Sequence, residues 1–172
     1  MILGIIQART SSTRLPGKVL KPIVGYPMLS LQIDRLKRSR KIDHVVVATS
    51  LNEEDQPIAD ACQKMGTDFF RGDLANVLDR FYQAARKYRP DHILRITGDC
   101  LLIDPQIVDE LVTFYLDADC DYASNCRPPS YPDGLDAEIL FFSALEKVWK
   151  ASVRPDEKEH VVVYIITHPD RF

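Results

Sequence analysis

Short apolar runs of strand length alternate along this sequence with longer amphipathic stretches of helix length. The runs at residues 2–7, 44–49 and 92–97 are apolar almost throughout, which is typical of strands buried on both faces of a parallel sheet. Between these runs, apolar residues recur three or four positions apart, as they do on one face of a helix. The alternation indicates βαβ units. We therefore expect an α/β fold with a Rossmann-like, mainly parallel sheet in three layers.

The turn and cap residues divide the chain into the remaining elements. A chain of 172 residues fits one domain, and no repeat or low-complexity tract interrupts it. Two polar segments, 8–18 and the Pro-rich 127–134, are expected to be loops. Residues 157–167 suit a helix or a strand equally well. The other expected helices cover 27–38, 55–65, 73–88, 104–115 and 143–150, and the other expected strands cover 67–70, 121–124 and 137–142.

The overall charge and the apolar content exclude several classes of protein. A net charge of −3 and a pI near 5.8 argue against a general nucleic-acid binder. No apolar run approaches the roughly 20 residues that span a bilayer, and the N-terminus does not have the pattern of a signal peptide. The four cysteines show no C-x-x-C spacing, so we expect reduced thiols in a soluble cytoplasmic protein.

The charge is distributed unevenly along the chain. Residues 1–41 hold nine basic side chains and one acidic side chain, a net charge of +8. An excess of this kind indicates that the N-terminal region meets an anion. The cluster at 35–41 is also explained as the solvated, basic end of a helix. The basic residues of the loop at 8–18 are not explained in that way.

That loop follows the first expected strand and is the strongest candidate for a binding site. It brings together Arg9, Arg14, Lys18 and four hydroxyl side chains. In open α/β sheets ligands bind at the carboxyl ends of the strands, and cations, hydroxyls and backbone N–H groups suit a polyphosphate there. The loop is neither a Walker A motif nor a dinucleotide-binding G-x-G-x-x-G motif. A polar surface loop without a ligand is the alternative.

Acidic residues form the second group of candidates. Asp99 directly follows the strand expected at 92–97, where a carboxylate can hold a divalent cation, although Gly-Asp is also ordinary turn chemistry. Asp136 and Glu138 share one side of a strand and could bind sugar hydroxyls or a metal. The alternative there is a hairpin turn at 133–134. Asp104 is better explained as a helix N-cap.

Six segments in order resemble one known family. They are QARTSSTRLPGKVL, VVVATS, FRGDLANVLDRFYQAA, RITGDC with LIDP, DGLDAEI, and EHV with YI and HP. Together they resemble the cytidylyltransferase-like spore coat polysaccharide biosynthesis protein F family, a relative of the CMP-KDO and CMP-acylneuraminate synthetases. The resemblance implies a nucleotide-diphospho-sugar transferase fold. It also implies transfer of CMP from CTP to an acidic, nonulosonic-type sugar, with release of pyrophosphate, in surface polysaccharide biosynthesis.

The resemblance also assigns roles to individual residues. Arg9 and Lys18 match positions that grip the triphosphate, and Asp99 matches the acid that binds Mg²⁺; these three are the expected catalytic residues. Segments that resemble the family's nucleotide pocket contain Ala8, Arg9, Ser12, Arg14, Lys18, Thr49, Ser50, Arg71, Asn76 and Arg80. On the sugar side, the expected residues are Asp136, Glu138, Glu159 and His160. A homodimer is a further expectation from the relatives.

The sequence departs from the family pattern in three places. Leu101 stands where the family has a proline, and Val162 and Val163 replace a polar residue and a proline. The family's C-terminal portion, with a second metal-binding acid, would follow Phe172, so we expect residues 1–172 to form one nucleotidyltransferase-like domain without it.

These departures leave a second hypothesis, a catalytically degenerate module that binds a nucleotide or a CMP-sugar. A glycosyltransferase is disfavoured, since the D-x-D at 119–121 falls at an expected helix-to-strand junction.

Overall fold

The computed structural model describes residues 1–12 and 14–172. Thr13, one of the hydroxyl residues of the predicted loop, lies outside the described residues. Within the described residues, six strands form the main sheet: β1 (Ile2–Gln7), β4 (His44–Ser50), β5 (Asp68–Gly72), β6 (His92–Thr97), β7 (Tyr122–Ser124) and β8 (Glu138–Phe141). A small hairpin consists of β2 (Pro22–Ile23) and β3 (Tyr26–Pro27).

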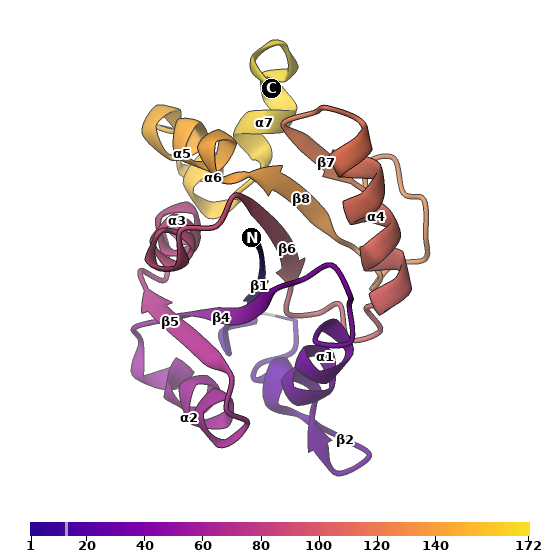
Figure 1. The fold of residues 1–172 in the computed structure, drawn as a ribbon. Helices are drawn as coiled ribbons and strands as arrows, with labels where there is room; N and C mark the ends of the chain where they lie inside the picture. The colour runs from indigo at the N-terminus through magenta and orange to yellow at the C-terminus, as the bar shows by residue number, and fades with distance from the viewer. Residues whose placement is uncertain (13) are drawn as a thin grey trace.

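Helices pack on both faces of the sheet (Figure 1). They are α1 (Met28–Leu36), α2 (Gln56–Lys64), α3 (Val77–Tyr88), α4 (Pro105–Asp117), α5 (Phe142–Ala151), α6 (Pro155–Glu159) and α7 (Val163–Thr167), with 3₁₀ turns at Lys18–Leu20, Glu53–Asp55 and Pro169–Arg171. One apolar core joins α1, α2 and α4 to one face, and a second joins α3, α5 and α7 to the other. The three-layer α/β prediction is therefore confirmed.

The strand order places β1 at the centre of the sheet. The order is β5-β4-β1-β6-β8-β7; β1 pairs in parallel with both β4 and β6, whereas β8 runs antiparallel to β6 and to β7. The chain leaves β1 toward β4 on one side and later returns to add β6 on the other. The carboxyl ends of β1 and β6 thus flank a switch point, where α/β sheets commonly open a crevice for ligands.

Most of the expected helices and strands lie within a few residues of the observed ones. The helix expected from residue 73 begins at Val77, because the side chain of Asn76 caps it by accepting from the backbone N–H of Asp79. The Asp104 side chain caps α4 as predicted. Residues 157–167 contain no strand: α6 ends at Glu159, α7 begins at Val163, and a turn with extended backbone at His160 joins them.

Two further findings bear on the class of protein. Within the described chain, no helix is long and apolar enough to cross a membrane. All four cysteines are free in the structure.

Candidate active site

The ends of β1 and β6 bring the two strongest sequence candidates together. Gln7 and Thr97 are paired at the last position of the two strands, and the N–H of Gly98 donates to the carbonyl of Gln7 at 2.8 Å. Beyond this pair, the loop after β1 carries Lys18 and the loop after β6 carries Asp99. Lys18 Nζ lies 2.9 Å from Asp99 Oδ2. Side chains 81 positions apart in the sequence therefore form an ion pair at the switch point.

The surroundings of Asp99 keep its carboxyl group ionised. Burial favours the neutral acid, but a 2.5 Å hydrogen bond from Thr97 Oγ1 and the nearby Lys18 ammonium outweigh it and lower the pKa of Asp99. An anionic carboxylate is therefore held at the end of the central strands near neutral pH. This is the state in which an oxygen ligand binds a hard cation.

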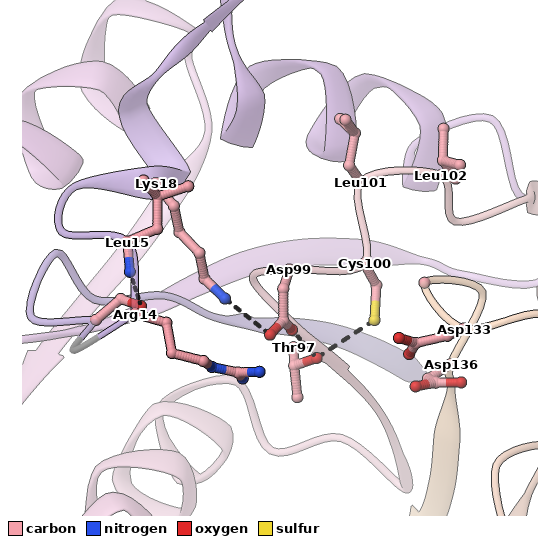
Figure 2. Close-up of a pocket in the computed structure, with 12 residues that line it drawn as sticks. Arg14, Leu15, Lys18, Thr97, Asp99, Cys100, Leu101, Leu102, Asp133 and Asp136 are labelled. Atoms are coloured by element: carbon pink, nitrogen blue, oxygen red, sulfur yellow. Dashed lines mark hydrogen bonds and ion pairs between the residues drawn. The ribbon is translucent and has the colours of Figure 1, made fainter.

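A cavity of about 570 Å³ opens beside this ion pair. Figure 2 shows Arg14 and Lys18 on one side of Asp99, with Asp133 and Asp136 across from them. Burial and the neighbouring acids Asp133, Glu138 and Asp99 raise the pKa of Asp136. The cavity thus has a cationic side, which suits phosphate, and an acidic side.

The acidic side of this cavity offers carboxylate oxygens, which are the ligands that Mg²⁺ prefers. Among the residues that the structure describes, no three His, Cys, Asp or Glu side chains gather as a preformed metal site. Mg²⁺ is, however, commonly held by one or two carboxylates while phosphate oxygens and water complete its octahedron. Asp99 and Asp136 line one cavity, and the pKa of Asp136 is raised partly by the charge of Asp99. These residues fit a cation that arrives with a polyphosphate.

Three further cavities are linked to one another by shared lining residues and include most of the other candidates. One of about 360 Å³ is lined by Arg9, Ser12, Arg14, Lys18, Asp99 and His160. It shares Arg9 with a cavity of about 660 Å³ that is lined by the loop at 73–76, including Asn76, and by Glu159. It shares Arg95 and His160 with a cavity of about 410 Å³, which also contains Asp136 and Glu138. Glu159 and His160, predicted together, therefore face different cavities.

Several predicted nucleotide-binding residues do not line these four cavities. Thr49 and Ser50 are fully buried at the end of β4, and Ala8 is almost fully buried after β1. The guanidinium of Arg71 donates to the carbonyls of Ser50 and Asn52, both at 2.9 Å. The Arg71 side chain thus holds backbone, whereas the buried Thr49 Oγ1 has no hydrogen-bond partner among the described residues. Contact of any of these residues with a nucleotide stays a prediction.

Arg80 also lies beneath the loop at 73–76. Its side chain is 1% exposed, and Nη1 donates to the carbonyl of Asp73 at 2.7 Å. Burial lowers the pKa of Arg80 to about 10, so the group stays charged at neutral pH. Among the described residues its Nε and Nη2 atoms have no partner. Arg80 thus places a buried cation behind the cavity that Arg9 and Asn76 line.

Two functional residues were missed by sequence reasoning. Asp55, 1% exposed, accepts from the backbone N–H of Thr10 at 2.6 Å, from Thr10 Oγ1 at 2.7 Å and from Ser50 Oγ. It thereby ties the first loop to the end of β4. Arg95 on β6 is paired with Glu138 on β8 in a buried salt bridge, and Tyr122 also donates to Glu138 at 2.8 Å. Asp55 lies outside the six segments that carry the family resemblance, and Arg95 opens RITGDC at a position that reads as an ordinary strand residue.

Comparison with known proteins decides the family. The family model described as "Cytidylyltransferase" matches residues 3–172. The chain belongs to the cytidylyltransferase family. Membership supports nucleotidyltransferase activity, which is the enzyme class that the resemblance predicted.

Relatives and solved structures agree with this assignment. The spore coat polysaccharide biosynthesis protein SpsF of Bacillus subtilis is 36% identical over 98% of this chain and 71% of its own length. A 3-deoxy-manno-octulosonate cytidylyltransferase of Zea mays is 39% identical over 64% of this chain and 37% of its own length. The structure of a cytidylyltransferase from Leptospira borgpetersenii superposes with a TM-score of 0.94 at 36% identity, covering 99% of this chain and 73% of that one. The predicted resemblance and nucleotidyltransferase fold are confirmed.

Proposed function

We propose that this cytidylyltransferase transfers CMP from CTP to an acidic, nonulosonic-type sugar during the synthesis of a surface polysaccharide. A hydroxyl of the sugar would attack the α-phosphorus of CTP, with loss of its proton. The new bond joins the sugar oxygen to the α-phosphorus. The bond that breaks is the α–β phosphoanhydride, and pyrophosphate leaves.

The observation that carries this proposal is the Lys18–Asp99 pair at the switch point. It sets an ammonium group and an ionised carboxylate side by side where the phosphates of a nucleotide would enter. Arg9 and Arg14 line the adjoining cavity and add positive charge for the β- and γ-phosphates. Such fixed charges accelerate phosphoryl-type transfers by stabilising the charge that develops on the leaving group.

Magnesium belongs to the same proposal. Asp99, with Asp136 across the cavity, would hold a Mg²⁺ ion whose charge neutralises the phosphate oxygens when it is bound. Residues of this chain would bind the phosphates and orient the metal-binding carboxylate. Lys18 and Arg14 bind phosphate, and Thr97 orients the Asp99 carboxylate through its hydroxyl.

An acidic sugar is supported by the neighbouring cavity of about 410 Å³. Arg127 and His160 can meet a carboxylate there, whereas Asp136 and Glu138 can accept from sugar hydroxyls. The names of two relatives are consistent with this class, because one concerns 3-deoxy-manno-octulosonate and the other a spore coat polysaccharide. The proposal of an acidic sugar therefore rests on the lining of this cavity and on the names of these two relatives.

Pyrophosphate release tests the proposal. The chain is incubated with CTP, Mg²⁺ and one sugar at a time, from a panel of sugar acids and of matched neutral sugars. We expect release with at least one sugar acid and none with the neutral sugars, and we expect Asp99→Asn to lower it strongly while leaving a measurable residual rate. Release with neutral sugars alone would contradict the acidic-sugar proposal. CTP binding without release on any sugar would favour the binding-module hypothesis.

A further inference from the structure

The loop that carries Asp99 is held from below by a buried amide on α1. Gln32 is fully buried, and its Nε2 donates to the carbonyl of Thr97 at 2.7 Å and to that of Cys100 at 3.1 Å. These two carbonyls flank Gly98 and Asp99. The amide nitrogen of Gln32 therefore donates both of its hydrogen bonds to the segment that carries Asp99.

A second side chain of α1 extends the same contact. Arg35 lies on the same face of the helix, three residues after Gln32. Its Nε donates to the carbonyl of Ile103 at 2.8 Å, and its Nη2 donates to the carbonyl of Leu102 at 3.2 Å. The carbonyls bound by α1 thus span the whole connection from the end of β6 toward α4. Leu101, which follows Cys100 within it, does not restrict its own backbone as a proline would.

The amide of Gln32 carries an energetic cost. Its Oε1 is buried and has no hydrogen-bond partner among the residues that the structure describes. A buried polar atom without a partner destabilises a fold, and a methionine of similar length would avoid this penalty. What an apolar side chain would lose is the pair of hydrogen bonds to the Asp99 loop.

We propose that Gln32 is a positioning residue of the transfer reaction. Its two bonds fix the backbone on either side of Asp99, and this places the carboxylate 2.9 Å from Lys18 Nζ and in reach of the Thr97 hydroxyl. The inference rests on the proposed function, because its catalytic consequence requires Asp99 to act in that reaction. Gln32 itself is buried under the loop and does not line the cavities.

Hydrogen–deuterium exchange tests the structural half without any need for activity. The variant is Gln32→Met, and the control is Asp34→Asn at an exposed position of the same helix. Two amides report on the loop, since Cys100 N–H donates to Thr97 and Ile103 N–H donates to Cys100. We expect these amides to exchange about 10- to 100-fold faster in Gln32→Met, with β4 unchanged. Unchanged exchange in the loop would overturn the proposal.

A double-mutant cycle tests the catalytic half. Gln32→Met should lower kcat about tenfold with little change in KM for CTP, and should change the residual activity of Asp99→Asn less than twofold. If Gln32→Met lowered kcat by the same factor in the original protein and in Asp99→Asn, Gln32 would not act through Asp99, and the proposal would be overturned. If the unchanged protein releases no pyrophosphate with any sugar, the proposed function fails and the positioning role fails with it. The exchange result then still decides whether Gln32 holds the loop.

Discussion

Replacing Asp55 by asparagine should loosen the phosphate-binding loop in a way that depends on pH. The carboxylate accepts two hydrogen bonds from Thr10 and one from Ser50 while being 1% exposed. Hydrogen bonds to a charged acceptor contribute roughly 1.5–3 kcal/mol each, against roughly 0.5–1.5 kcal/mol for a neutral acceptor. Asparagine can keep the two bonds from Thr10 in their neutral form, so Asp55→Asn should destabilise the fold by about 2 kcal/mol at pH 7.

The pH dependence of this loss has a definite sign. Burial alone would raise the pKa of Asp55, but the hydrogen bonds from Ser50 and Thr10 prevail and lower it from its ordinary value of 3.8. A carboxyl whose pKa is depressed in the folded state contributes stability above the unfolded pKa and loses it as pH falls through the folded pKa. The difference in unfolding free energy between the original protein and Asp55→Asn should therefore have its full value above about pH 4 and shrink at lower pH.

Urea unfolding of both proteins from pH 7 down to pH 3, followed by circular dichroism, measures this difference. Glu54→Gln is the matched control, because the Glu54 side chain is exposed next to Asp55 in the same 3₁₀ turn. The unfolding free energy of the control should fall by less than about 0.5 kcal/mol, as is usual for surface substitutions. A loss for Asp55→Asn equal to that of the control, or one that stays constant below pH 4, would refute the reasoning.

Three other substitutions test the site. Lys18→Ala should lower kcat for pyrophosphate release by about 10²-fold or more, and near-normal turnover would remove its assigned role. In Gly98→Ala the new Cβ would lie 2.9 Å from the carbonyl oxygen of Gln7, so thermal unfolding should show a loss of about 1–3 kcal/mol; an unchanged melting temperature would contradict this. Arg95→Met leaves Glu138 buried without its partner and should cost about 3–5 kcal/mol in urea unfolding. Adding Glu138→Gln should restore part of that loss, and an equal loss in the double variant would show that the unpaired charge is not the cause.

The fold was largely predictable because its signals are local. The runs at 2–7, 44–49 and 92–97 are apolar enough to be buried on both faces, and each became an inner strand. The meeting of the first loop with Asp99 was predictable for a related reason. Carboxyl ends of neighbouring parallel strands share one edge of a sheet, so residues that follow such strands converge.

The residues that support the site were not predictable from local pattern. Asp55 meets Thr10 across 45 positions, and Gln32 meets Thr97 across 65. Asp55 was expected only as the start of a helix, and Gln32 lies within the helix expected at 27–38 without a motif that marks it. Their partners are set by how α1 and α2 pack on the sheet, which periodicity does not specify. The single-domain prediction, the homodimer and the cytoplasmic location stay predictions.

The crevice between β1 and β6, with Lys18 and Asp99 at its centre, is the proposed CTP site. Isothermal titration with CTP, ATP, GTP and UTP, each with and without Mg²⁺, tests it most directly. We expect selective CTP binding that Mg²⁺ strengthens and that Lys18→Ala and Asp99→Asn both weaken. Equal binding of all four nucleotides, or CTP binding that neither substitution changes, would contradict it.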